Sequence, residues 1–219
     1  KPVNCKYALN INIKYSGQPV EVNGSFAIVA EDVYGRPRYG IFYPKVLLIN
    51  TINFYSDFDF STTNESVFLF SGCMENVKEN VASSQVKFVI KKESVVLSTY
   101  STANVEVNLE DYPKVTLNLS KDKIALGNAQ VLIKPQKDIF SNLWYIGNTD
   151  ENGNIDVFMS PGTYTIVVRY TESDGNEKTV AIGDVTIPAE KVQTLKLEVK
   201  PQSNITLSAN IPDNLNNIN

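Results

Sequence analysis

The stretch that decides the fold is TDENGNIDVFMSPGTYTIVV, residues 149–168. It contains two turn signals, because Asn152-Gly153 can take the positive φ values of a tight hairpin turn and Pro161-Gly162 is a second turn pair. An apolar run with a period of two follows each turn. The alternating apolar residues are Ile155, Val157 and Met159 after the first turn, and Tyr164, Ile166 and Val168 after the second. The stretch therefore predicts β-strands that each bury one face in a sandwich.

The same period of two continues along almost the whole chain. It starts with Leu9, Ile11 and Ile13 and ends with Leu195, Leu197 and Val199. Asp111-Tyr112-Pro113 interrupts the pattern, and Pro113 cannot donate to a central ladder, so we expect a domain boundary there. We predict an all-β chain of two tandem antiparallel β-sandwich domains, immunoglobulin-like or transthyretin-like, at 1–111 and 112–200. A C-terminal extension with one candidate strand follows at 201–219.

The second predicted domain carries a family resemblance. An opening strand, the phrase Thr149-Asp150-x-x-Gly153, a strand, and then Pro161-Gly162-x-Tyr164-Thr165 resemble the transthyretin-like sandwiches. These include the CnaB-type repeats of surface proteins and the carboxypeptidase regulatory-like domain. The resemblance covers about residues 112–200 and implies a stalk, spacer or accessory module. Many CnaB-type domains also carry a Lys–Asn crosslink. Lys121 or Lys123 could supply its amine, but 192–199 holds no Asn, so we do not expect the crosslink.

Composition excludes several classes of function. The formal net charge of −4 argues against a nucleic-acid partner, which would favour a basic stripe. The chain has no histidine, so Ser-His-Asp and Cys-His catalytic systems and His-ligated metals are excluded. No apolar stretch is long enough to span a membrane. We therefore predict a protein that is not an enzyme and has no cofactor.

Cysteine and asparagine patterns favour an extracellular location. Cys5 and Cys73 form an even pair that suits a disulfide in an oxidising compartment, although two separate thiols remain an alternative. Four Asn-x-Ser/Thr sequons agree with this compartment, at Asn23, Asn64, Asn118 and Asn204. No charged-then-apolar leader precedes Lys1, so we expect any signal peptide to have been removed or not to be included.

Two groups of residues were candidates for binding chemistry. Asp150, Asn152, Asn154 and Asp156 have the spacing of a calcium loop, but the glycine stands at 153 instead of 155 and position 161 is proline. A turn explains the same residues, so we predict no metal site. An aromatic-rich stretch offers a ligand surface for a glycan, since tyrosine joins an apolar body to a polar tip. Its candidate residues are Tyr34, Tyr39 and Tyr43.

The tail holds one further strand pattern. Ile205, Leu207, Ala209 and Ile211 alternate with polar residues after the second domain is complete. This strand, or Leu9, Ile11 and Ile13 at the other end, could be donated to a neighbouring copy. The whole chain in this respect resembles a donor-strand pilin. We predict an extracellular structural subunit of a cell-surface filament or assembly, with copies of itself or other surface proteins as partners. The alternative is an adhesin or carbohydrate-binding module that uses the tyrosines.

Overall fold

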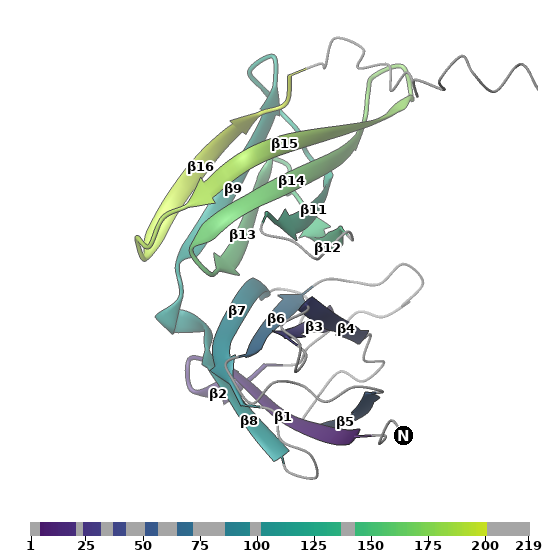
Figure 1. Cartoon of the computed structure of the whole chain (residues 1–219). Coiled ribbons are helices and arrows are strands. Elements are labelled where there is room, and N and C mark those ends of the chain that lie inside the picture. Colours follow the sequence, from purple (N-terminus) through teal and green to yellow (C-terminus); the bar gives the residue numbers. More distant parts are fainter. Residues whose placement is uncertain are drawn as a thin grey trace, which may run out of the picture.

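The computed structural model describes residues 5–20, 24–31, 37–42, 51–56, 65–71, 86–96, 102–136 and 143–200. Side chains are described within 10–20, 86–96, 102–136 and 143–200. The described chain is β-strand joined by turns, with one short 3-10 helix, Leu109–Asp111, between a first half and a second half (Figure 1). The predicted all-β sandwich fold is confirmed.

The first half forms two groups of strands. In one group β1 is paired with β2, β5 and β8, and in the other β6 lies between β3 and β7, with β4 outside β3. The strands are β1 (Cys5–Tyr15), β2 (Gln18–Pro19), β3 (Gly24–Glu31), β4 (Pro37–Phe42), β5 (Thr51–Ser56), β6 (Glu65–Ser71), β7 (Lys87–Val95) and β8 (Thr102–Asn108).

The second half packs two sheets face to face. One sheet has β9 between β13 and β16, and the other has the order β12-β11-β14-β15. The strands are β9 (Lys114–Lys121), β10 (Ile124–Ala125), β11 (Gln130–Pro135), β12 (Trp144–Asn148), β13 (Asn154–Met159), β14 (Gly162–Thr171), β15 (Glu177–Ile187) and β16 (Val192–Glu198). Their alternating apolar residues make one core, which includes Leu117, Leu119, Ile133, Ile146 and Ile166 at 0% exposure.

The turns of residues 149–168 connect strands as the sequence predicts, but they are not hairpins. β12 and β14 belong to one sheet of the second half, whereas β13 belongs to the other, so the chain crosses between sheets at both turns. Gly153 has a φ of 78° and its N–H donates to the carbonyl oxygen of Asp150. Alternation identifies a strand and its buried face, but it leaves the strand's partner open.

Three strand pairs are parallel, which differs from the predicted antiparallel sandwiches. β1 runs parallel to β8, β9 to β16, and β7 to β13. The last pair joins the two halves, so one eight-stranded sheet continues from β4 to β9, which is also paired with β10 and β16. The N–H of Ser160 donates to the carbonyl oxygen of Val89, and its Oγ accepts from the N–H of Lys91 at 2.8 Å. Because the sheet is continuous, the division into domains at 111/112 stays a prediction.

Candidate strand-addition site

β16 is an edge strand whose outer side has no partner among the strands described (Figure 1). Its inner side is paired with β9 from Val192↔Lys114 to Glu198↔Ser120. The carbonyl oxygen of Lys191 accepts from the Lys114 N–H, and the Val199 N–H donates to the Ser120 carbonyl oxygen. Backbone groups alternate along a parallel ladder, so odd-numbered residues face β9. The N–H and C=O groups of residues 192, 194, 196 and 198 therefore point to the free edge.

The side chains along β16 show that the core is thinly covered here. Leu195 and Leu197 face the core but are only partly buried, whereas Leu117 and Leu119 on the adjacent β9 are fully buried. On the other face of the strand Val192 is 80% exposed. A further strand would pair with the outward backbone groups, which have no partner in the described part of the chain, and would cover the half-buried leucines.

Another edge of the second half, on β15, is less suited to strand addition. Val185 is paired with Tyr164 and Ile182 with Ile166, so Gly183 and Asp184 together oppose Thr165 in a bulge. Asp184 has a φ of 54° at this point. Bulges and charges on an edge strand hinder the approach of another strand. β16 carries no register shift along its seven residues, which makes it the better candidate.

The two predicted donor strands have different surroundings. Ile205, Leu207, Ala209 and Ile211 lie outside the described residues. Leu9, Ile11 and Ile13 lie in β1, which is paired with β8 along one edge and with β5 and β2 along the other. Ile11 and Ile13 are 3% and 4% exposed. Since both edges of β1 are occupied within its own chain, the geometry favours the C-terminal segment as the donor.

Several other predicted sites fall outside the described residues. Cys5 lies in β1, but its side chain and all of Cys73 are outside, so the disulfide stays a prediction. The same holds for the sequons at Asn23, Asn64 and Asn204, and for the ligand surface at Tyr34, Tyr39 and Tyr43, of which only Tyr39 has a described backbone, in β4.

The sequon at Asn118 lies in β9, where its side-chain amide is already engaged. Nδ2 donates to Asn154 Oδ1 at 2.6 Å and to the carbonyl oxygen of Asn152 at 3.3 Å. A glycan is attached through this nitrogen in place of one of its two hydrogens, so glycosylation would have to displace at least one of these hydrogen bonds. Glycosylation of this chain stays a prediction, and Asn118 is its least favoured position.

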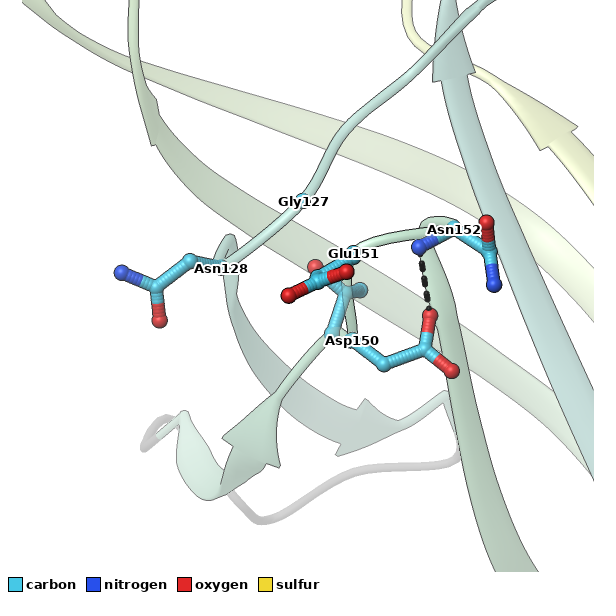
Figure 2. A pocket seen from close by; sticks show the side chains of 6 residues that line it. Gly127, Asn128, Asp150, Glu151 and Asn152 are labelled. Carbon is cyan, nitrogen blue, oxygen red and sulfur yellow. Dashed lines mark hydrogen bonds between the residues drawn. The ribbon is translucent and has the colours of Figure 1, made fainter.

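The residues with calcium-loop spacing have separate partners. Asp150 Oδ1 accepts from the N–H groups of Asn152 and Asn154, both at 2.9 Å, as Figure 2 shows for Asn152. Asp156 Oδ1 instead accepts from Thr116 Oγ1 at 2.6 Å. The loop borders an open hollow of about 610 Å³ lined by 127–128 and 149–152. These hydrogen bonds build the turn, and among the described residues no three acidic or cysteine side chains form a metal-binding group.

One charged cluster in the second half could not be predicted from the sequence. Lys121 Nζ forms an ion pair with Glu172, and it lies 5.5 Å from the centre of the Tyr170 ring. The hydrogen bond that Lys121 Nζ donates to the Glu172 carboxylate raises the pKa of Lys121 above its usual range. The lysine that the CnaB-type resemblance offered as a crosslinking amine is therefore held as a cation. Glu172 is 51 positions away in sequence, so no local pattern could have indicated the pair.

Searches against known proteins found structural similarity only. No protein-family model matches the sequence, and no curated protein matches it. No helix in the described part has the length and apolar character needed to cross a membrane.

Solved structures similar to this chain include pilus and fimbrial proteins. The major pilin subunit BcpA of Bacillus cereus is 13% identical with a TM-score of 0.30, covering 91% of this chain and 70% of its own. The tip fimbrial protein Mfa3 of Porphyromonas gingivalis is 9% identical with a TM-score of 0.28, covering 90% and 96%. The minor pilin GBS52 of Streptococcus agalactiae is 11% identical with a TM-score of 0.26, covering 91% and 98%. At these values the similarity assigns no function by itself.

Proposed function

We propose that this chain is a non-enzymatic structural subunit of an extracellular filament or related cell-surface assembly, in which a strand of one copy adds to the β16 edge of another. The observation that carries the proposal is the regular outer edge of β16, which has no described partner and lies beside the partly buried Leu195 and Leu197. Both features leave free energy to be gained by an incoming strand, from backbone hydrogen bonds and from apolar burial.

The C-terminal segment 205–211 is the donor that fits this edge. Its residues alternate, so Ile205, Leu207, Ala209 and Ile211 can all face the core side while the polar residues between them face outward. On the core side they would continue the row of Leu195 and Leu197. Seven residues are also as many as β16 contains. The partner is thus a second copy of the chain, joined through main-chain hydrogen bonds.

A proline at Thr194 tests the acceptor edge. The Thr194 N–H faces outward, so Thr194→Pro removes a donor for the added strand while leaving the β9 ladder intact, as proline is tolerated on the free side of an edge strand. Thr179→Pro on β15 is the matched control. At the hairpin the Glu172 N–H donates to the Asn176 carbonyl oxygen, so the backbone groups of Asn176 face β14. Backbone groups point to alternate sides along a strand, so the Thr179 N–H, three positions later, faces the outer side of β15.

We expect the unsubstituted chain and Thr179→Pro to form oligomers whose size grows with concentration, and Thr194→Pro to remain monomeric, by light scattering and electron microscopy. Substitution of both Ile205 and Leu207 by Asp should also abolish oligomer formation, because it removes apolar side chains from the donor strand. Undiminished assembly of either variant would contradict strand addition. Concentration-independent monomers of the unsubstituted chain would mean that the segment pairs within its own copy.

A further inference from the structure

We infer that the fold bears tension along the chain, through two parallel strand pairs arranged in series. In each half the first strand and the last strand are neighbours and run parallel. β1 pairs with β8 from Ala8↔Thr102 to Lys14↔Asn108, and β9 pairs with β16 from Val192↔Lys114 to Glu198↔Ser120. Each contact contains seven residue pairs. We call these contacts the first and second terminal-strand pairs.

The direction of the strands determines how force acts on these pairs. The chain comes into each half at the beginning of its first strand and leaves at the end of its last strand. In a parallel pair these two points are at opposite ends, about 20 Å apart for seven residues. A pull on the two points slides one strand along the other, so all the ladder hydrogen bonds resist together. A pull at the same end would instead break the bonds one after another.

Side chains reinforce the first terminal-strand pair along its length. Asn10 Nδ2 donates to Asn104 Oδ1 at 3.3 Å, and Asn12 Nδ2 donates to Glu106 Oε1 at 2.9 Å. Both bonds join residues that are direct partners in the ladder. On the opposite face Ile11, Ile13, Val105 and Val107 are all buried. Beyond the ladder, the Ser16 N–H and Oγ both donate to Glu110 Oε1 at 3.1 Å. Sliding β8 along β1 would break these contacts together with the ladder.

The second terminal-strand pair is fastened at both ends. At its beginning the Lys114 N–H donates to the Lys191 carbonyl oxygen, and Lys191 Nζ donates to the carbonyl oxygen of Asp111 at 2.6 Å. At its end the Val199 N–H donates to the Ser120 carbonyl oxygen, and Val199 is 1% exposed. Residues 109–113 connect the two pairs directly, and Leu109 among them is fully buried. Force on the chain therefore passes from one pair to the next.

This inference goes beyond the proposed function and does not depend on it. Force crosses both pairs whenever one partner holds the chain at the beginning of β1 and another holds the C-terminal segment, whatever the two partners are. The two roles also use different backbone groups of β16. The terminal-strand pair uses the odd-numbered residues that face β9, and strand addition uses the even-numbered residues that face outward.

Single-molecule force spectroscopy on the full chain tests the inference. In one arrangement the chain is pulled from its two ends under reducing conditions. In the other, the handles are at the C-terminal end and at a short tag inserted between Asp122 and Lys123, in the turn after β9. The second arrangement pulls β9 and β16 apart at the same end of their contact. In the end-to-end arrangement, release of 8–108 adds about 350 Å of chain and release of 114–198 about 290 Å, which identifies the half that opens.

We expect the second half to open at a several-fold higher force in the end-to-end arrangement than in the same-end arrangement. Equal forces in the two arrangements would overturn the inference. Because both measurements use the unsubstituted sequence of the strands, the comparison does not depend on any variant folding.

Three substitutions on β16 separate this role from assembly. Gln193→Pro removes an N–H that faces β9 and should lower the end-to-end opening force of the second half. Gln193→Ala is its control, because it removes only the side-chain bonds to the carbonyl oxygens of Pro188 and Glu190. Thr194→Pro should leave the force unchanged. If Gln193→Pro opens at the force of Gln193→Ala, the ladder does not bear the tension. Loss of assembly in Thr194→Pro at unchanged force would support both roles separately.

Discussion

The hydroxyl group of Thr149 connects two turns at one end of the second half through two hydrogen bonds. Its Oγ1 donates to the Leu126 carbonyl oxygen at 2.6 Å and accepts from the Ala129 N–H at 2.9 Å, and the residue is 5% exposed. The sequence places Thr149 in a turn phrase, but only the structure shows that its side chain replaces backbone pairing for the neighbouring loop.

Thr149→Val should therefore destabilise the chain by about 2–3 kcal/mol, because the methyl group leaves the buried Ala129 N–H and the partly buried Leu126 carbonyl oxygen without their partner. Urea unfolding followed by the fluorescence of Trp144, the single tryptophan, measures the change. Thr116→Val is the control, since its bond to Asp156 is exposed, and it should cost less than about 1 kcal/mol. Equal costs would show that burial of the Thr149 bonds is unimportant.

Tyr164 makes stability depend on pH in the alkaline range. It is 2% exposed, and its hydroxyl donates to the Ser160 carbonyl oxygen at 2.7 Å. Burial raises the pKa of Tyr164 above its ordinary value of about 10. The folded state thus keeps the proton where the unfolded chain loses it, so this contribution is complete below pH 10 and falls as pH rises further.

We expect the free energy of unfolding to decline above about pH 10, with one proton accounting for up to about 1.4 kcal/mol per pH unit. Tyr164→Phe should show a shallower decline than the unsubstituted chain, measured by urea titrations at a series of pH values. A slope that does not change on substitution would mean that other tyrosines cause the decline.

At the scale of strands and turns, the surroundings of a turn glycine decide whether alanine can replace it. Gly153 and Gly175 both have positive φ, 78° and 83°. A Cβ at Gly153 would lie 2.4 Å from the Leu119 carbonyl oxygen, because the chain there crosses between packed sheets. A Cβ at Gly175 would meet nothing within 4 Å, since this glycine is at the tip of the β14–β15 hairpin.

Gly175→Ala should cost about 1 kcal/mol from backbone strain alone. Gly153→Ala should cost more than about 3 kcal/mol, since strain is joined by a clash with backbone that must move. Thermal unfolding of the two variants under identical conditions gives the comparison. If the two variants lose the same stability, the backbone moves away from the clash between the new Cβ and the Leu119 carbonyl oxygen without a cost in free energy.

The strands themselves could largely be predicted from the sequence, but their partners could not. Ile155, Val157 and Met159 predict β13 and its buried face, because alternation is a property of the strand alone. Pairing of β13 with β7 depends on residues about 70 positions away, such as Val89 and Met159, and no local pattern records such a distance. The parallel pairing of β16 with β9 could not be predicted for the same reason, because the two strands are far apart in the sequence.

The sequence predicts the candidate site only in part. Leu195, Leu197 and Val199 predicted a closing strand, and β16 lies there. The sequence could not show that the outer side of this strand has no partner among the described strands, since an exposed edge and a paired central strand can have the same alternation. The half-burial of Leu195 and Leu197, which makes the edge a candidate, is a property of packing alone.

For the whole molecule, the continuous sheet predicts that the two halves unfold together at equilibrium, when no force is applied. Val89 comes from the first half but is fully buried in the core of the second, in the same cluster as Trp144. Val105 is fully buried in β8 and is not part of that cluster. Substitution of either by alanine should cost about 2 kcal/mol.

We expect both Val89→Ala and Val105→Ala to move the Trp144 fluorescence transition to lower urea, because a cooperative unit shares its stability. Val89→Ala is the positive control, since it touches the cluster of Trp144 directly. If Val105→Ala leaves the Trp144 transition in place, the halves unfold separately and the contact between β7 and β13 does not couple them.

The pairing of first strands with last strands also fixes when the chain can fold. Asn10 and Asn104, which bond across β1 and β8, are 94 positions apart. At about 5–20 residues per second, the ribosome needs about 5–20 s to make the stretch between them. Throughout that time β1 lacks its last partner, and the second half repeats the delay for β9 and β16. On the ribosome each terminal-strand pair therefore forms only after its half is complete, and this delay is compatible with the export that the proposed extracellular role requires.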